Sequence, residues 1–131
     1  MPLFAIHGNH DDTTRDGGSE VLSAMDILSG ANLLNYFGQQ DEVDSLLISP
    51  VLLQKGSTKI ALYGLGGMRD ERLMRMWQAN KIQFLRPKVE GGGKDDDEWF
   101  NIFCIHQKRD DDDWRGSKNC VHETMIPGAC Q

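Results

Sequence analysis

The chain has 131 residues, enough for one domain and too few for several. Hydrophobic residues make up 39% and charged residues 26% of it, so the composition fits a packed core and excludes a largely disordered chain. No window approaches the roughly 20 apolar residues of a membrane span, and the first residues lack the basic flank of a secretory signal. Three widely spaced cysteines, an odd number, argue against a disulfide framework. We therefore expect a protein of a reducing compartment without membrane association.

The net charge of −6 depends on two short acidic runs. Residues 90–98 hold five acidic side chains and Asp110–Asp113 hold four, whereas Met68–Lys88 contain six basic residues and two acidic ones. Runs of like charge are typical of solvated loops. The acidic total therefore neither predicts nor excludes a polyanionic partner.

The first third of the chain predicts a strand, a helix and a second strand. Leu3–Ile6 is a short apolar run, as in a buried strand, and polar turn formers follow at 7–12. A helix is expected next, with Ser19 as its cap and Gly30 as its left-handed end. Leu33–Phe37 predicts another short strand.

The middle of the chain predicts a hairpin. Ile48–Gln54 and Lys59–Tyr63 are two strand-like runs, joined by a tight connection at 55–58. Pro50 places the first strand at a sheet edge or at its own beginning, because proline cannot donate to the ladder. Three glycines within residues 64–67 predict a flexible turn.

The second half predicts one more helix and one more strand. Asp70 is the expected helix cap, and Trp99–Ile105 is rich in aromatic and β-branched residues, as in a strand. The apolar stripe of the helix consists of Leu73, Met76 and Trp77. Residues 90–98 and 108–131 show no period and are expected to be irregular loops. Strands that alternate with helices favour the α/β class.

Histidine-bearing loops follow two of the predicted strands. Residues 8–11 (Gly-Asn-His-Asp) come after the first strand, and His106 comes after the last one. Ligands in α/β sheets bind beyond the carboxyl ends of strands. If the two strands are neighbours, Asn9, His10 and His106 should line one cleft.

These residue types suit a metal-assisted phosphoester site. A histidine nitrogen binds transition metals, and an amide oxygen suits a harder ion such as Mn²⁺. Gly8 should let the backbone turn so that both following side chains enter the cleft. A histidine near a phosphate can protonate the leaving oxygen or stabilise charge, and two metal ions can activate water. Composition and spacing equally allow His106 to be a hydrogen-bonded core histidine and the loop to be an ordinary capping turn.

The run Leu3–Asp12 resembles the third signature of the calcineurin-like metallophosphoesterases. Further runs resemble, within that superfamily, the nucleases of DNA double-strand-break repair; these runs are 49–66, 70–73, 84–87 and 99–103. The likeness extends from Pro2 to about Arg109. It implies an α/β fold in which a β-sandwich is flanked by helices in four layers, with residues 1–131 forming the central part of the nuclease domain.

The resemblance also implies roles for individual residues. Asn9 and His106 match ligands of a two-manganese centre, and His10 matches the histidine that acts on the phosphate and the leaving group. Asp11 is expected to hold the loop or a ring by hydrogen bonds. His7 is expected to be structural. The implied enzyme is a manganese-dependent phosphodiesterase, a 3′–5′ exonuclease and single-strand endonuclease.

The implied partners are DNA, a coiled-coil ATPase of the structural-maintenance type, a phosphopeptide-binding adaptor and a second copy of the chain, in the nucleus. The dimer would form through helices near the metal site. The candidate phosphate contacts are Arg69, Arg72, Arg75 and Arg109, and an ordinary surface arginine is an equally good interpretation of each.

The sequence departs from the resemblance in several places. The family places an Asp-x-His signature and a bridging aspartate before the Gly-Asn-His-Asp loop, and a Gly-His-x-His signature after it; neither signature occurs in residues 1–131. Lys108 stands where the family has an asparagine after the His-Gln pair. Asp110–Asp113 add negative charge, the sign that DNA also carries, near a loop expected to meet DNA. We expect the polypeptide alone to bind metal weakly and to cleave little.

Two other functions remain open at this stage. The chain could be a non-catalytic module that serves as a dimer- or adaptor-binding surface. A zinc site is also conceivable, formed by Cys120, His122 and Cys130, although a fourth ligand and paired Cys-x-x-Cys spacing are missing.

Overall fold

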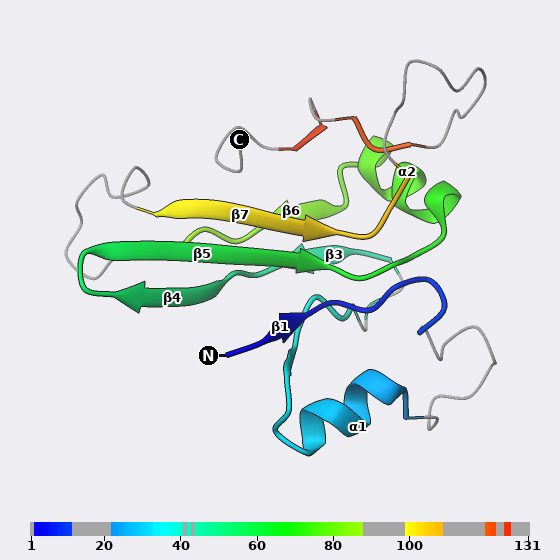
Figure 1. The fold of residues 1–131 in the computed structure, drawn as a ribbon. Helices are drawn as coiled ribbons and strands as arrows, with labels where there is room; N and C mark the ends of the chain where they lie inside the picture. The colour runs from blue at the N-terminus through cyan, green and yellow to red at the C-terminus, as the bar shows by residue number, and fades with distance from the viewer. Residues whose placement is uncertain are drawn as a thin grey trace.

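The computed structural model describes residues 2–11, 22–40, 42, 44–87, 99–108, 120–122 and 125–126. The elements in these ranges are β1 (Phe4–Ala5), α1 (Ala24–Gly30), β2 (Asn35–Tyr36), β3 (Leu46–Ile48), β4 (Val51–Lys55), β5 (Thr58–Leu65), α2 (Asp70–Gln78), β6 (Ile82–Phe84) and β7 (Phe100–Ile105). Sheets with few helices make a mixed α/β structure, as the sequence predicts (Figure 1). Neither of the described helices is long or apolar enough to cross a membrane.

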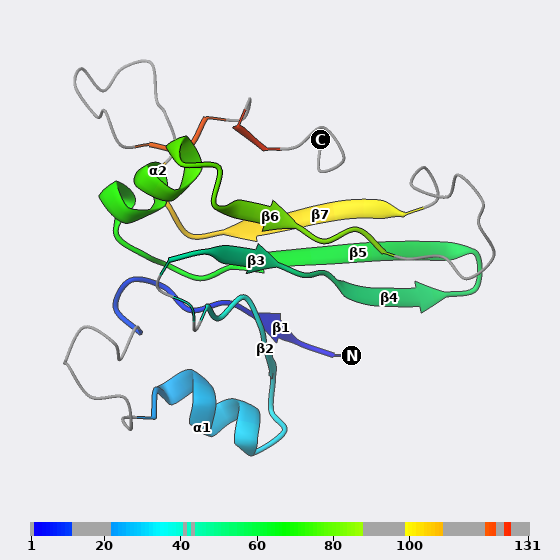
Figure 2. The same cartoon turned by 180° about the vertical axis from the view of Figure 1, so that it is seen from behind.

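The central sheet has the strand order β4-β5-β7. β4 pairs with β5 in antiparallel orientation, and β5 pairs with β7 in parallel orientation from Ile60 opposite Phe100 to Leu65 opposite Ile105. Two smaller parallel sheets join β3 to β6 and β1 to β2. Seen from behind, β3 and β6 lie in front of the central sheet as a second layer, while α1 and β2 lie below it (Figure 2).

The core lies between the central sheet, the β3–β6 layer and α2. Its buried members are Leu46, Ile48, Ala61, Tyr63, Leu65, Leu73, Met76 and Val121. Ala61, Tyr63 and Leu65 share one face of β5 because side chains alternate along a strand. Full burial of each large apolar side chain contributes about 1.5–3 kcal/mol. This packing fixes α2 beside the carboxyl ends of β5 and β7.

Aromatic rings continue the core along β6 and β7. The Phe84 ring meets the Tyr63 ring edge-on, with 6.0 Å between centroids, and the Phe103 ring at 5.4 Å. The Tyr63 hydroxyl donates to the Leu85 carbonyl at 3.1 Å, so its polar end is satisfied. β6 was not predicted from the sequence, because it depends on pairing with β3, a strand far away in the chain.

The predicted strands are confirmed, although their boundaries shift by one to three residues. Ile48 belongs to β3, because the Ser49–Pro50 break separates it from β4, which begins directly after Pro50 and forms the sheet edge as predicted. The predicted turn at 64–67 is wrong in its first half. Gly64 and Leu65 pair with β7, and the ladder holds them extended.

The helix boundaries also differ from the predictions. Ser23 caps α1, whereas the predicted cap, Ser19, lies outside the described residues. Gly30 is the last helical residue, and the left-handed residue is Asn32, with φ of 58°. Asp70 is the first residue of α2 rather than its cap, where its carboxylate favours the positive end of the helix dipole.

The expected irregular loops lie mostly outside the described residues. Nothing of residues 90–98 is described, and of 108–131 the described residues are 108, 120–122 and 125–126. There the Val121 N–H donates to the Lys108 carbonyl at 2.9 Å, which connects the end of β7 to Val121 in the core.

The cap of α1 predicts a stability change in acid. The pKa of Asp26 lies below its usual value, chiefly because the Ser23 hydroxyl and then the Ser23 backbone N–H donate to its carboxylate. Such a group stabilises the fold above the pKa of the unfolded state, and the contribution is lost as the pH falls through the folded-state value. We expect the free energy of unfolding to fall below about pH 4, and to fall less in Asp26→Asn than in the wild type.

Urea unfolding at about pH 7, 4 and 3 measures this effect. An Asp44→Asn variant is the matched control, because Asp44 is exposed and lies outside the cap. Identical acid-side losses in wild type and Asp26→Asn would contradict the assignment.

Candidate active site

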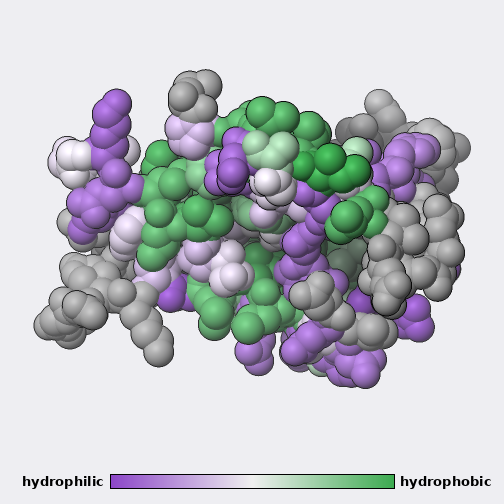
Figure 3. Space-filling model, turned by 90° about the horizontal axis from the view of Figure 1, so that it is seen from below, coloured by the Kyte–Doolittle hydropathy of each residue, from purple (hydrophilic) through white to green (hydrophobic). Residues whose placement is uncertain are grey.

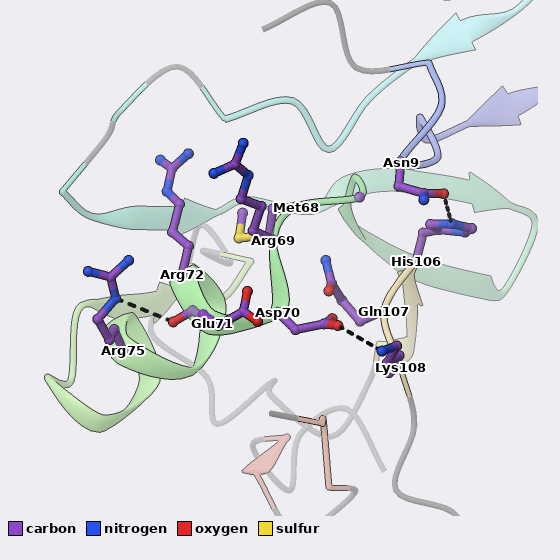
Figure 4. Close-up of a pocket in the computed structure, with 11 residues that line it drawn as sticks. Asn9, Met68, Arg69, Asp70, Glu71, Arg72, Arg75, His106, Gln107 and Lys108 are labelled. Atoms are coloured by element: carbon purple, nitrogen blue, oxygen red, sulfur yellow. Dashed lines mark hydrogen bonds and ion pairs between the residues drawn. The ribbon is translucent and has the colours of Figure 1, made fainter. Parts of the chain in front are cut away.

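The loops that follow β1 and β7 come together where Asn9 faces His106 (Figure 4). Asn9 Oδ1 and His106 Nε2 lie 3.2 Å apart, although 97 residues separate them in the chain (Figure 4). An amide oxygen only accepts hydrogen bonds, so the imidazole nitrogen donates in this pair. The predicted proximity of Asn9 and His106 is confirmed. Their role as metal ligands stays a prediction.

This pair fits a divalent cation by its donor chemistry. An amide oxygen and an imidazole nitrogen are both accepted by manganese and similar ions. Neighbouring ligands of an octahedral ion stand about 3 Å apart, and the Asn9–His106 separation of 3.2 Å is close to this value. Within the described ranges no three His, Cys, Asp or Glu side chains form a group that could hold a metal. The described site therefore contributes two donors.

Two glycines after β5 allow the Asn9 loop to approach the sheet. The Gly67 N–H donates to the His7 carbonyl at 2.9 Å. A Cβ on Gly67 would lie 2.8 Å from the Asn9 nitrogen, and one on Gly66 would lie 2.0 Å from the His7 ring. Neither position leaves room for a side chain. Steric fit at Gly66 and Gly67 therefore sets the position of the Asn9 backbone.

The side chain of His7 also holds the Asn9 loop against Gly66 and Gly67, at a contact that we call the glycine crossing. Because a carbonyl only accepts, His7 Nε2 donates to the Gly67 oxygen at 3.2 Å, and Nδ1 accepts from the Tyr36 hydroxyl at 2.8 Å. The two rings also meet edge-on, with centroids 5.9 Å apart. The predicted structural role of His7 is confirmed.

The turn that carries Asn9 and His10 is closed by Asp11. The Gly8 N–H donates to the Asp11 carboxylate at 3.1 Å, and the Asp11 N–H donates to the Gly8 carbonyl at 3.2 Å. Asp11 thus holds the loop by hydrogen bonds, as expected. The backbone turns at Gly8 as expected, and it does so without a positive φ, since the described glycines with positive φ are Gly38 and Gly56.

At Gly8 the lack of a side chain is needed for space, and not for a special backbone conformation. A Cβ there would lie 3.3 Å from Asp11 Oδ2 and 3.6 Å from His106 Nε2. His10 is exposed on the same turn and does not appear among the described residues that line the cavity below. The structure therefore brings Asn9 and His106 together, with His10 on the adjoining surface.

A cavity of about 710 Å³ lies between this pair and α2. Its lining residues are Asn9, Gly67, Met68, Arg69, Asp70, Glu71, Arg72, Arg75, His106, Gln107 and Lys108 (Figure 4). Four of these side chains are cationic and two are carboxylates, so the lining favours an anion. Of the four predicted phosphate contacts, Arg69, Arg72 and Arg75 line the cavity, and Arg109 lies outside the described residues.

Most of the cationic side chains at the cavity have protein partners. The Arg72 guanidinium donates to the Glu42 carbonyl at 3.0 Å, and Arg75 Nε donates to the Glu71 carbonyl at 3.4 Å. Lys108 forms an ion pair with Asp70 at 3.9 Å across the cavity (Figure 4). The Arg69 guanidinium makes no hydrogen bond or ion pair with the part of the chain described. It is exposed and available to a bound anion.

Gln107 lines the cavity, although the sequence did not predict it as a site residue. Its only signal in the sequence is its position directly after His106. Its amide nitrogen is shielded from solvent and has no hydrogen-bond partner among the described residues. A buried polar group without a hydrogen bond lowers the stability of the fold by about 1–3 kcal/mol. A ligand in the cavity that accepted this hydrogen bond would remove the cost.

The alternative zinc site is only partly described. Cys120 Sγ and His122 Nε2 are 3.8 Å apart, whereas Cys130 lies outside the described residues. Cys120 is buried and His122 is exposed. This pair alone is short of the four ligands of a structural zinc site.

Comparison with known proteins identifies relatives. No protein-family model matches the chain. The chain is 52% identical over 126 residues to the double-strand break repair protein MRE11 of Homo sapiens, and 46% identical over 132 residues to MRE11 of Arabidopsis thaliana. These matches cover 96% and 97% of this chain. The chain matches a segment of MRE11.

The match extends over the whole candidate site. With 96% of the chain aligned to human MRE11, both Asn9 and His106 lie inside the matched span. The chain covers 16% of the human MRE11 and 17% of the Arabidopsis MRE11, about one-sixth of the length of these relatives. MRE11 from Caenorhabditis elegans is 43% identical over 128 residues.

Proposed function

We propose that this chain is the part of a metal-dependent DNA nuclease of double-strand-break repair that carries one side of its metal site. The observation that supports this most is the Asn9–His106 pair, which two distant strand ends bring to 3.2 Å. The pair lies in a chain that is about half identical to MRE11, a double-strand break repair protein. A cavity with a cationic lining adjoins it.

Asn9 and His106 would hold manganese, with two ions in the complete site. When bound, the metal would activate water and polarise the phosphate oxygens. Asn9 is kept in place by the glycine crossing, and His106 by the end of β7. These two elements thus preorganise the donors before an ion binds.

His10 would act on the phosphate and the leaving oxygen. It follows Asn9 on the same tight turn, and the Asp11 carboxylate closes that turn on the Gly8 N–H. An exposed imidazole beside the metal ligands can donate a proton to the leaving oxygen. Arg69 would bind a phosphate of the DNA strand, and Arg109, which lies outside the described residues, would do the same. The reactions proposed are 3′–5′ exonuclease and single-strand endonuclease cleavage.

The second candidate function is a non-catalytic interaction module, and the apolar surface of α1 favours it. Its members are Ile27 and Leu28 in α1, 61% and 38% exposed, and Leu22 and Leu33 just outside its two ends, 71% and 65% exposed. Hydrophobic side chains gather in neighbouring groups on the face seen from below (Figure 3). The proposed occupant of the α1 surface is a second copy of the chain, the homodimer that the resemblance to the repair nucleases implies.

Disruption of this surface should abolish the dimer. In the full-length protein, Ile27→Asp places a charge in the proposed interface, and we expect monomers in place of dimers by light scattering. Leu47→Asp is the matched control, since Leu47 is 50% exposed on β3, away from α1. A dimer that persists in Ile27→Asp would contradict the interface.

The remaining partners and the location follow from the same proposal. A nuclease of double-strand-break repair would work in the nucleus, with a coiled-coil ATPase and a phosphopeptide-binding adaptor. Cleavage of a radiolabelled single strand and a hairpin in manganese, compared with EDTA, tests the enzymatic function. Pull-down of the adaptor without any cleavage would instead support the interaction module.

A further inference from the structure

Gln107 occupies a special position in the wall of the cavity. It follows His106 at the end of β7, and its carboxamide extends into the space between His106 and α2 (Figure 4). The amide nitrogen has no hydrogen-bond partner among the described residues and is shielded from solvent. Buried polar groups are otherwise almost always paired, and the exceptions call for an explanation.

We propose that the Gln107 carboxamide donates a hydrogen bond to a non-bridging phosphate oxygen of a DNA strand bound in this cavity. The proposal rests on the proposed nuclease function and adds a residue that positions the substrate. The terminal torsion of glutamine is soft, so a small rotation turns the N–H toward the cavity. A charged oxygen acceptor makes such a bond stronger than a neutral one.

The surroundings of Gln107 favour a phosphate over a base. Arg69 and Arg72 line the cavity from the α2 side, whereas Gln107 lines it from the β7 side. The cavity volume of about 710 Å³ lies in the range of small-ligand sites. Contacts with phosphate oxygens set the register of a bound strand without reading its sequence. Gln107 thus supplies a neutral donor that completes a cationic wall.

The test uses the full-length protein and a single-stranded oligonucleotide. Gln107→Met keeps the shape of the side chain and removes the donor, and Gln107→Glu replaces the donor with an anion. We expect Kd in EDTA to rise about tenfold for Gln107→Met and further for Gln107→Glu. KM for cleavage in manganese should rise in parallel, with kcat unchanged. Gln83→Met is the matched control, because Gln83 is exposed on β6 outside the cavity.

A second measurement separates a direct contact from a structural effect. In an oligonucleotide scanned with single methylphosphonate linkages, one linkage should weaken wild-type binding about tenfold more than it weakens binding by Gln107→Met. Equal penalties in both proteins at every linkage, or wild-type affinity in Gln107→Met, would overturn the contact.

The two proposals fail in distinguishable ways. Wild-type protein that neither binds nor cleaves the oligonucleotide overturns both. Wild-type protein that binds and cleaves, with Gln107→Met equal to Gln83→Met, overturns the Gln107 contact alone. Full activity in a His106→Ala variant overturns the proposed nuclease site, whatever Gln107 does.

Discussion

Replacement of His10 by alanine in the full-length protein is expected to slow manganese-dependent cleavage of a DNA strand at least about a hundredfold. The imidazole sits on the turn that carries Asn9, where it can supply the proton for the leaving oxygen. His10 does not line the described part of the cavity, so manganese and DNA affinities should change little. Single-turnover cleavage of a radiolabelled hairpin measures the rate.

Asn9→Ala should show a different pattern. Loss of the amide oxygen removes a proposed metal donor, so manganese affinity, measured by calorimetry, should fall together with cleavage. His122→Ala is the matched control, because His122 is exposed outside the cavity.

A His10→Ala protein that cleaves at the wild-type rate would refute the proposed role of His10. Two tight manganese sites in the 131-residue polypeptide would refute the expected weak binding.

The second large effect is expected at Gly66, where alanine should lower the free energy of unfolding by about 3 kcal/mol. The new Cβ would lie 2.0 Å from the His7 ring. That ring cannot yield without leaving the Tyr36 hydroxyl and the Gly67 carbonyl, to which it is hydrogen-bonded. Because the same crossing holds the Asn9 loop, manganese-dependent cleavage should fall as well. Urea unfolding monitored by circular dichroism measures the stability.

Two further variants test the cause of this effect. Gly30→Ala is the matched control: nothing lies within 4 Å of its Cβ position, and its free energy of unfolding should change by less than about 1 kcal/mol. His7→Ala removes the ring that Gly66→Ala strikes, so the double variant should lose less stability than the two single losses combined. Additive losses would show that the clash with His7 is not the cause.

The elements with a local signal were predictable from the sequence. The apolar stripe of α2 has the period of a helix, and β7 is rich in aromatic and β-branched residues. Both signals can be recognised within a few neighbouring residues. Pro50 marked the start of β4, because proline has no N–H to donate to a sheet ladder. This property belongs to one residue and needs no tertiary contact. The Gly-Asn-His-Asp run likewise predicted a turn, and Asp11 closes it as expected.

Other features required contacts that no local pattern carries. β6 exists through its parallel pairing with β3, and Gly64 stays in β5 because β7 lies beside it. The need for glycine at Gly66 comes from the His7 ring, 59 positions earlier in the chain.

The sequence by itself determined the residue types of the site and the local turns and periods around them. Only the tertiary structure decided that Asn9 and His106 meet at 3.2 Å, that α2 lies beside them, and that Gln107 enters the same cavity. The physical reason is range. Propensity and capping act over a few residues, whereas steric fit, sheet pairing and burial join segments nearly a hundred residues apart.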